Sequence, residues 1–265
     1  MPVVTSHAPG VPSFTDLATP DPAAAKAFYG ALFGWEFDDR PAGPDMTYTM
    51  CLKGGNVTAG MMALSPEMAQ AGMPPVWSTY VTVDDVDATT ARVEAAGGQV
   101  MRPPMDVMEA GRMSVVADST GAAVCLWEGK QSIGSEVINE HGALSWNELL
   151  TPDPATAARF YGELLGWTTE VVAMGEGMGD YTVFHVEGGN EQGIAGAVTP
   201  PMEGMPPAWL VYFIVDDCDA AAALAAEQGG TVMGAPMDIP GTGRLVPVQD
   251  PQGAMFAVMT PESTQ

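Results

Sequence analysis

The stretch "SFTDLATPDPAAAKAFYGALFGW", residues 13–35, returns in the same chain as "SWNELLTPDPATAARFYGELLGW", residues 145–167. The start of each copy mixes apolar and polar side chains in the alternating way that is typical of a half-buried strand. In the first copy, Asp21 followed by Pro22 is a signal for a helix N-terminus, and Gly34 suits the left-handed residue that ends a helix. The stretch therefore predicts a strand followed by a helix, and the chain contains this unit twice.

The duplication continues beyond this unit. "GMPPVWSTYVTVDDVDA" at 72–88 returns as "GMPPAWLVYFIVDDCDA" at 204–220, at the same offset. Self-similarity over such a length indicates repeated structural units. We expect a first domain at residues 1–130, a linker at 131–142, and a second domain at 143–265.

Each half also contains a second strand–helix unit. In the first half "VWSTYVTV" (76–83) predicts a strand, and "DDVDATTARVEAAGG" (84–98) predicts a helix with an Asp cap and a Gly end. "GRMSVVADSTGAAVCLW" (111–127) then predicts two strands around a turn. The chain therefore holds four modules. Their closely spaced strands favour an α+β fold with curved, antiparallel-rich sheets over a parallel nucleotide-binding fold.

The composition is that of a globular protein with a strong negative charge. Of the 265 residues 46% are hydrophobic, and 9 Lys and Arg stand against 33 Asp and Glu, for a formal net charge of −24. Such a field repels phosphate backbones and anionic lipids, so we expect no nucleic-acid partner and no membrane partner. A neutral or cationic small ligand is favoured.

The cysteines and the hydropathy indicate a compartment. Cys51, Cys125 and Cys218 are odd in number and form no CxxC pair, so the sequence predicts no disulfide framework and a reducing environment. No run approaches the roughly 18 apolar residues of a membrane span. We expect a cytoplasmic protein that is a monomer or a homodimer.

The motifs "TPDPxxAxxFYGxLxGW", "VDDVDA" and "GRxxxxxDxxG" resemble the vicinal oxygen chelate superfamily, the group of glyoxalases, bleomycin-resistance proteins and extradiol dioxygenases. The chain looks most like its tandem two-domain actinobacterial members, which are loosely labelled glyoxalase-like or hydroxylase. The resemblance implies four βαβββ modules that pair into two half-barrel cups. In that family the cup holds a divalent metal in the enzymes or a drug in the resistance proteins.

The family's metal-ligand positions are changed in this chain. The first-strand ligand position holds Phe14 or Trp146, and the matching position of the second modules holds Trp77 or Trp209. The final-strand glutamate of the family is replaced by Cys125 in the first half and by Ala in the second. Divalent metals require oxygen, imidazole or thiolate ligands, which aromatic rings do not supply. We therefore expect no metal and no other cofactor.

A cup without a metal would present aromatic side chains and one carboxylate in each half. Strand alternation puts Asp16 on the face of Phe14, and Glu148 on the face of Trp146. A carboxyl group in an apolar cup has a raised pKa and is a candidate general acid or base. We expect the concave faces to carry also Thr79, Val211 and Phe213 beside the tryptophans, while Leu17, Tyr80, Leu149 and Tyr212 face the helices.

Four further residues are candidate ligand contacts. Cys125 is either a cup-lining thiol or a small buried hydrophobe, and His185 is the histidine most suited to line a cup. Arg112 and Arg244 occupy matching positions in the two halves. Pairing with Asp106 and Asp238, or with the turn aspartates, is the favoured interpretation for the arginines, and anchoring of an anionic ligand group is the alternative.

Two functions remain open at this point. The first is metal-independent binding of an aromatic, hydrophobic small molecule, such as a natural product or antibiotic, for sequestration or presentation to an enzyme. The second is a cofactor-free tailoring enzyme of the isomerase, cyclase or hydroxylase type that uses Asp16 or Glu148. A metal-dependent glyoxalase-like lyase is disfavoured because the ligand positions are lost.

Overall fold

The computed structural model describes residues 3–43, 46–174, 179–189, 192–200, 202 and 204–262. The first half contains β1 (Pro12–Thr19), α1 (Pro22–Phe33), β2 (Glu36–Gly43), β3 (Met46–Lys53), β4 (Asn56–Ala63), α2 (Pro66–Gln70), β5 (Val76–Thr82), α3 (Val86–Thr90), β6 (Gln99–Val107), β7 (Gly111–Ala117) and β8 (Ala123–Gly129). The second half contains β9 (Leu144–Leu150), α4 (Pro154–Leu165), β10 (Thr168–Ala173), β11 (Asp180–His185), β12 (Ala195–Val198), β13 (Ala208–Ile214), α5 (Cys218–Glu227), β14 (Thr231–Val232), β15 (Met237–Ile239), β16 (Gly243–Gln249) and β17 (Met255–Pro261).

The predicted strand–helix unit forms as its sequence indicates. The Asp21 side chain accepts hydrogen bonds from the N–H groups of Ala23 and Ala24 at the start of α1. Gly34 ends the helix at φ 68°, a left-handed conformation that costs glycine little. Asp153 and Gly166 play the same parts for α4. Local capping therefore sets both ends of the two long helices.

Each half builds one curved sheet from its own two modules. The strand order is β2-β3-β4-β1-β5-β8-β7-β6 in the first half and β10-β11-β12-β9-β13-β17-β16-β14 in the second, with β15 paired to β16. In the first sheet β1 pairs antiparallel with β5, and it pairs parallel with β4. The cups therefore form within each half, and the prediction of an α+β fold with two half-barrel cups is confirmed.

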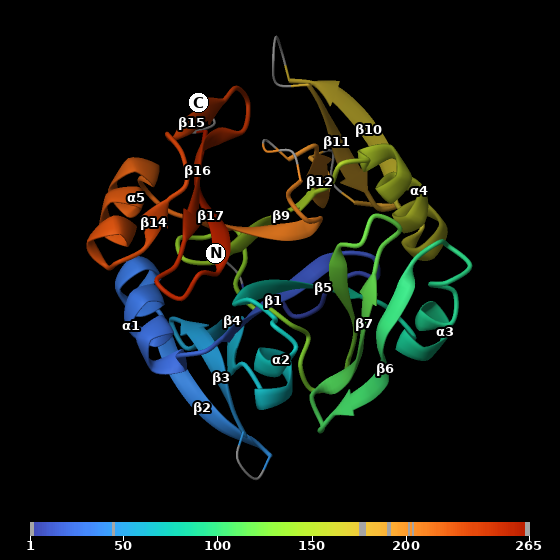
Figure 1. Ribbon diagram of the computed structural model, residues 1–265, viewed down its shortest axis with the longest axis horizontal. Helices are drawn as coiled ribbons and strands as arrows, with labels where there is room; N and C mark the ends of the chain where they lie inside the picture. The colour runs from blue at the N-terminus through green and yellow to red at the C-terminus, as the bar shows by residue number, and fades with distance from the viewer. Residues whose placement is uncertain are drawn as a thin grey trace.

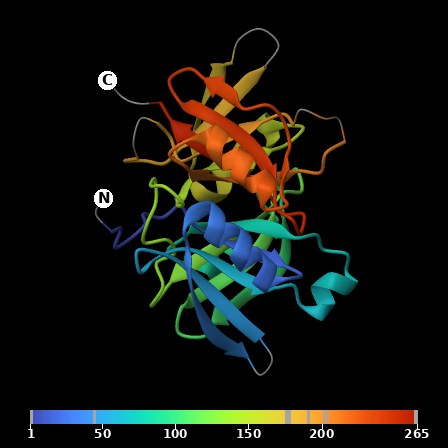
Figure 2. The ribbon, with the colours of Figure 1, turned by 90° about the vertical axis from the view of Figure 1, so that its left-hand side faces the viewer.

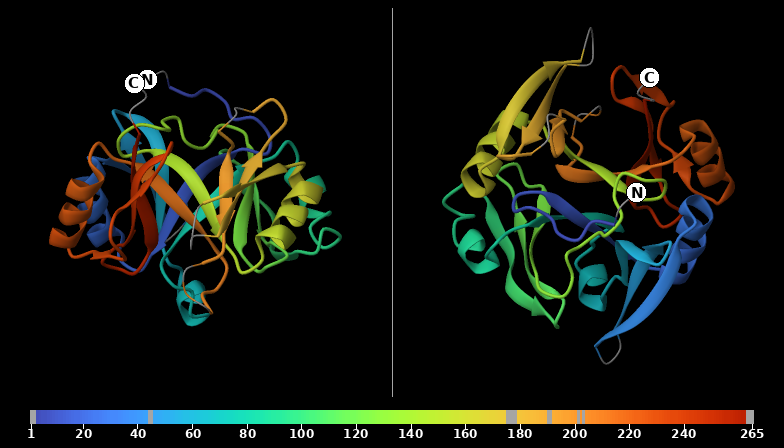
Figure 3. Two further views of the ribbon diagram at one scale, coloured as in Figure 1. Left: turned by 90° about the horizontal axis from the view of Figure 1, so that it is seen from above. Right: turned by 180° about the vertical axis from the view of Figure 1, so that it is seen from behind.

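The two sheets pack back to back. Figure 1 shows one cup open at the bottom of the view, between β2 and β6, and the other open at the top, between β10 and β15. Helices α1 and α5 lie side by side at one edge of the molecule, and α4 and α3 lie at the other (Figures 1 and 3). The short helix α2 projects from the body of the first half (Figure 2). The cups therefore face away from each other.

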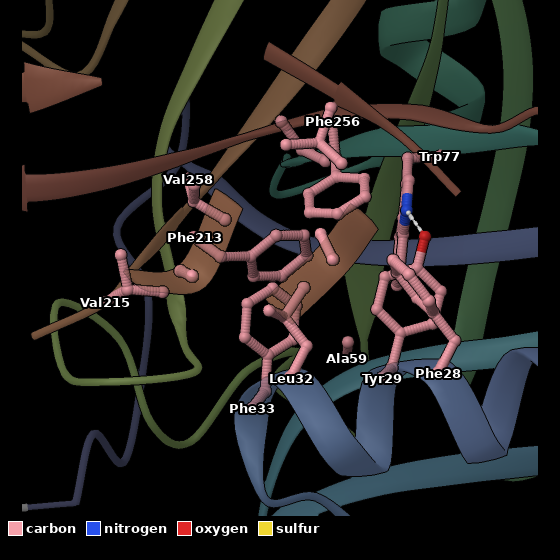
Figure 4. Close-up of a cluster of buried hydrophobic side chains, with 14 of the residues drawn as sticks. Phe28, Tyr29, Leu32, Phe33, Ala59, Trp77, Phe213, Val215, Phe256 and Val258 are labelled. Atoms are coloured by element: carbon pink, nitrogen blue, oxygen red, sulfur yellow. Dashed lines mark hydrogen bonds between the residues drawn. The ribbon is translucent and has the colours of Figure 1, made fainter. Parts of the chain in front are cut away.

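The hydrophobic core belongs to both halves at once. One buried cluster joins α1 and β5 of the first half to β13, β17 and α5 of the second. A second cluster joins β5 and β8 to α4, β11 and β13. Figure 4 shows Phe28 and Phe33 of α1 beside Phe213 and Phe256 of the second half. The halves are thus two repeats that share their cores.

The segment that connects the halves is tied to the first sheet. β8 ends at Gly129 and β9 begins at Leu144. Between them, the Ser135 N–H donates to the carbonyl of Ser13, and Glu136 and Val57 exchange hydrogen bonds. The segment predicted as a linker therefore packs as part of the first cup. Among the described residues, no helix combines the length and the apolar character that a bilayer crossing requires.

Candidate functional site

The concave face of the first cup carries an aromatic cluster. The register of β1 against β5 places Phe14 opposite Tyr80 and Asp16 opposite Ser78. Phe14, Tyr80, Cys125 and Trp127 form one buried cluster, in which the Phe14 and Tyr80 rings lie edge to face at 5.6 Å between centroids. This cluster and the carboxyl group of Asp16 make the floor of the cup.

Two tyrosines donate hydrogen bonds to the Asp16 carboxyl group. Tyr80 Oη lies 2.8 Å from Asp16 Oδ2, and Tyr48 Oη, from β3, lies 3.1 Å from the same oxygen. Tyr48 passes directly over Gly60, where an added Cβ would meet the tyrosine oxygen at 1.9 Å. The glycine therefore makes room for the tyrosine to reach the carboxyl group.

Burial raises the pKa of Asp16, because the ionised carboxylate has lost its water. Hydrogen bonds from Tyr80, Tyr48 and Ser78 oppose this shift. Burial also raises the pKa of Tyr48 and Tyr80 well above the usual tyrosine range, with the neighbouring Asp16 charge as a further cause. The tyrosines are thus neutral hydrogen-bond donors, and the carboxyl group is the titratable member.

The second cup repeats this arrangement with a glutamate. Tyr212 Oη donates to Glu148 Oε1 at 2.9 Å, and Tyr181 is a second hydrogen-bond partner of Glu148. The indole N–H of Trp146 donates to Tyr181 Oη at 2.8 Å. Burial again raises the pKa of the carboxyl group, and Tyr181 again passes over a glycine, Gly196.

The two tyrosines of each cup are the functional candidates that sequence reasoning missed. Tyr80 and Tyr212 were predicted to face the helices, but they face the cups. The sequence holds one signal for these residues. Each half has a tyrosine three residues after Trp77 or Trp209. Which face of the sheet Tyr80 occupies follows only from the register in which β5 pairs with β1.

The prediction that Trp77 and Trp209 line the cups is wrong. Trp77 lies opposite Leu17 and is buried against α1, where its indole N–H donates to Tyr29 Oη at 3.0 Å (Figure 4). Trp209 likewise donates to Tyr161 Oη at 2.9 Å. Both lie one residue out of phase with the cup face, because strand side chains alternate between the two faces of the sheet.

Thr79, Val211 and Phe213 also lie on the side away from the cups. The Thr79 hydroxyl donates to Asn147 Oδ1 at 2.9 Å, which joins the two halves. Val211 and Phe213 are fully buried in the core that α1 shares with the second half. Their predicted place on the concave face is wrong because they share the strand face of Trp77 or Trp209. Leu17 and Leu149 lie in the core as expected.

Arg112 and Arg244 form ion pairs at the outer surface. Arg112 binds Asp87 through two nitrogens and lies 3.4 Å from Asp106. Arg244 binds Asp219 through two nitrogens and Asp238 at 2.8 Å. The favoured pairing with Asp106 and Asp238 is confirmed. The guanidinium groups are engaged there, outside the aromatic clusters of the cups.

Cys125 and His185 lie on the cup sides of their strands. Cys125 belongs to the floor cluster, and burial raises the pKa of its thiol, so the thiol is protonated. His185 shares a face of β11 with Tyr181, and its Nε2 lies 3.8 Å from Glu170 Oε2. His185 is therefore a side-wall residue of the second cup.

The donor set of the cups does not fit the divalent metal that the family's enzymes hold. Each floor offers one carboxyl group, beside neutral phenols and, in the first cup, a protonated thiol. Within the described ranges, no group of three or more His, Cys, Asp or Glu side chains could hold a metal ion. Divalent cations require several such ligands.

An open hollow of about 650 Å³ lies outside the cups, along α4 and the outer side of β10 and β11. It lies where Thr169 stands in place of Phe37 of the first half, whose ring packs against Gly30. No residue predicted for the site lines it. The carboxyl–tyrosine floors therefore remain the candidate site.

Curved sheets with a titratable group and aromatic rings on the concave face are typical of proteins that take up a small molecule. Residues 11–126 and 143–258 each match the Glyoxalase/Bleomycin resistance protein/Dioxygenase superfamily. The chain belongs to this superfamily, with one copy of the family fold in each half.

Named relatives cover the whole chain. The chain is 45% identical over 266 residues to a protein named glyoxylase CFP32 from Mycobacterium tuberculosis, with all of both chains covered. It is 39% identical over 274 residues to the anthracycline biosynthesis protein DnrV of Streptomyces peucetius, covering 97% of this chain and 95% of the relative. Among solved structures, the 2,3-dioxygenase LapB from Pseudomonas sp. KL28 matches with a TM-score of 0.66 and 17% identity, covering 96% of this chain and 94% of LapB. The last match shows a shared fold.

Proposed function

We propose that this protein binds an aromatic small molecule in a cup, where the ligand stacks on aromatic side chains and hydrogen-bonds the carboxyl–tyrosine group. The observation that carries this proposal is the carboxyl group with two tyrosine partners on an aromatic floor, built twice in one chain. Aromatic walls supply apolar area, and one polar group fixes the orientation of the ligand.

The hydrogen bonds of the floor indicate which ligand group fits. Tyr212 and Tyr181 each have one hydroxyl hydrogen, and both are directed to Glu148. Tyr181 in turn accepts the Trp146 indole N–H. The groups left to a ligand are then acceptor lone pairs of the ionised carboxylate and the phenols. A ligand with a hydroxyl or amino donor satisfies them, and the net charge of −24 favours a cationic one.

The relatives support an aromatic ligand. The Streptomyces relative is named for the biosynthesis of anthracyclines, which are polycyclic aromatic compounds. The Mycobacterium relative is named a glyoxylase, but a metal-dependent lyase reaction does not fit the donor set of either cup. Three free, buried cysteines agree with a reducing, cytoplasmic location, and we expect a monomer or a homodimer.

The second candidate function is acid–base chemistry on the same ligand. A raised pKa brings a carboxyl group nearer to neutral pH, where it exchanges a proton with a substrate most readily. Glu148 or Asp16 would then take a proton from one ligand atom and return it to another, as an isomerisation or a cyclisation requires. No cofactor is needed for such a step.

The test is a binding titration with two matched probes. 2-Aminoanthraquinone carries an amino donor that anthraquinone lacks, at a position from which it cannot bond the ligand's own carbonyl groups. We expect the protein to bind 2-aminoanthraquinone at least about tenfold more tightly than anthraquinone, because a hydrogen bond to a charged group contributes about 1.5–3 kcal/mol. The Glu148→Gln variant should lose most of this discrimination, while Glu163→Gln on the exposed face of α4 should keep it.

The same variants separate the two candidate functions. If the ligand is recovered unchanged from the native protein, binding is the function. If liquid chromatography separates an isomerised product of unchanged mass that Glu148→Gln does not form, acid–base chemistry is the function. Equal binding of both anthraquinones by the native protein would contradict the role given to the carboxyl group.

A further inference from the structure

The two cups differ in how far their floors reach solvent. In the first cup Phe14 is 8% exposed and Asp16 is 4% exposed. Their counterparts in the second cup, Trp146 and Glu148, are both partly exposed. Neighbouring positions follow the same trend, since Ala18 and Trp127 are buried where Leu150 and Met259 are partly exposed.

The connecting segment accounts for the closed first cup. Gly134 lies so close to β1 that an added Cβ would be 3.1 Å from the Cβ of Phe14. Ser132 accepts a hydrogen bond from the Trp127 indole N–H, and Ser135 bonds Ser13. The segment therefore covers the end of the floor at Phe14 and Trp127.

Over the described residues, the chain leaves both cups in the same way. Glu262 follows β17, and its N–H donates to the carbonyl of Thr242 while its carboxylate accepts from Gly241. In the first half the Lys130 N–H donates to the carbonyl of Ala110, which is the matching contact. The contacts that cover the first floor come from residues after this common point, at Ser132 and Gly134.

The floor of the second cup also carries smaller or more flexible side chains than the floor of the first. Cys125 and Trp127 of the first floor correspond to Ala257 and Met259 of the second. Methionine is unbranched and flexible, so it adjusts to a ligand where a tryptophan held by a hydrogen bond does not.

We propose that the second cup is the ligand-binding cup of this protein and that the first cup is a closed structural copy. The inference rests on the proposed function, since it says which of the two floors takes the aromatic ligand. It assigns Glu148, Tyr181 and Tyr212 to recognition, and it assigns the connecting segment at 131–142 to closing the first floor.

The first measurement is binding stoichiometry on the full chain with 2-aminoanthraquinone, by native mass spectrometry and calorimetry. We expect one equivalent for each chain, bound about tenfold more weakly by Glu148→Gln and with unchanged affinity by the surface control Glu163→Gln. Two equivalents, or one equivalent that survives Glu148→Gln unchanged, would overturn the assignment.

The second measurement does not depend on a ligand. N-bromosuccinimide at a low molar ratio oxidises accessible indoles, and peptide mass spectrometry locates the oxidised tryptophan. We expect Trp146 to react well before Trp127, which the connecting segment covers. Equal rates, or earlier reaction of Trp127, would overturn the difference between the cups. Failure of 2-aminoanthraquinone to bind, with Trp146 still reacting first, would count against the proposed function alone.

Discussion

The carboxyl groups of Asp16 and Glu148 are the residues on which the proposed chemistry depends. Each has lost part of its hydration, and each receives tyrosine hydroxyl donors from neighbouring strands. Such a group is costly to ionise where it stands, and a raised pKa at a concave surface is a common mark of a functional position.

The raised pKa of Asp16 predicts a pH-dependent contribution to stability. Because the folded pKa lies above the unfolded value of 3.8, the contribution is fully present below that value and is lost as the pH rises through the folded pKa. Asp16→Asn removes the titration, so its stability relative to the native protein should improve from pH 3.5 to pH 7. The gain should be about 1.4 kcal/mol for each unit by which the pKa is raised.

Urea unfolding of both proteins at each pH measures this difference, and the other acidic groups cancel because both proteins carry them. A difference that stays constant with pH would contradict the raised pKa.

Gly60 predicts a steric effect at the same site. An alanine there would place its Cβ 1.9 Å from Tyr48 Oη, so the tyrosine must leave Asp16. We expect Gly60→Ala to destabilise the protein by about 1–3 kcal/mol, as overpacking does, in thermal and urea unfolding. Gly234→Ala is the matched control, because nothing lies within 4 Å of its added Cβ. Equal stabilities of the two variants would contradict the contact.

At the scale of elements, the repeated "FYG" motif joins each long helix to the other half of the molecule. Tyr29 of α1 donates from its hydroxyl to Asp250 Oδ2 at 2.9 Å, and Tyr161 of α4 donates to Asp118 Oδ2 at 3.0 Å. Each aspartate uses its other oxygen to accept backbone N–H groups of its own turn. The helix motif and the D-x-x-G turn are therefore two ends of one contact between the halves.

Removal of this contact predicts a loss of stability. Tyr29→Phe keeps the ring in the core but leaves Asp250 Oδ2 and the Trp77 indole N–H without their buried partner. We expect a cost of about 1–3 kcal/mol in urea unfolding, and the same for Tyr161→Phe. Tyr48→Phe, which alters a cup and not the contact between halves, is the comparison. A cost near zero in both helix variants would show that the contact is not stabilising.

At the scale of the whole molecule, the shared cores predict that both halves unfold together. The two largest clusters each take side chains from both halves, so neither half completes a core alone. We expect one cooperative transition, with far-ultraviolet circular dichroism and tryptophan fluorescence coinciding. Residues 1–130 expressed alone should be unfolded or aggregated. Two separate transitions, or a stable isolated half, would contradict this expectation.

The sequence by itself determined the four repeated modules and the residues that carry one side of each floor. Helix caps such as Asp21 and Gly34 act within a few residues, and alternation along one strand keeps Asp16 on the face of Phe14 whatever that strand pairs with. Only the tertiary structure decided which face of β5 meets the cup. Pairing in register placed Tyr80 opposite Phe14 and Trp77 opposite Leu17, because a shift of one residue exchanges the two faces of a strand. The back-to-back packing of the sheets, a contact between distant parts of the chain, then buried the tryptophans and left the tyrosines to hold the carboxyl groups.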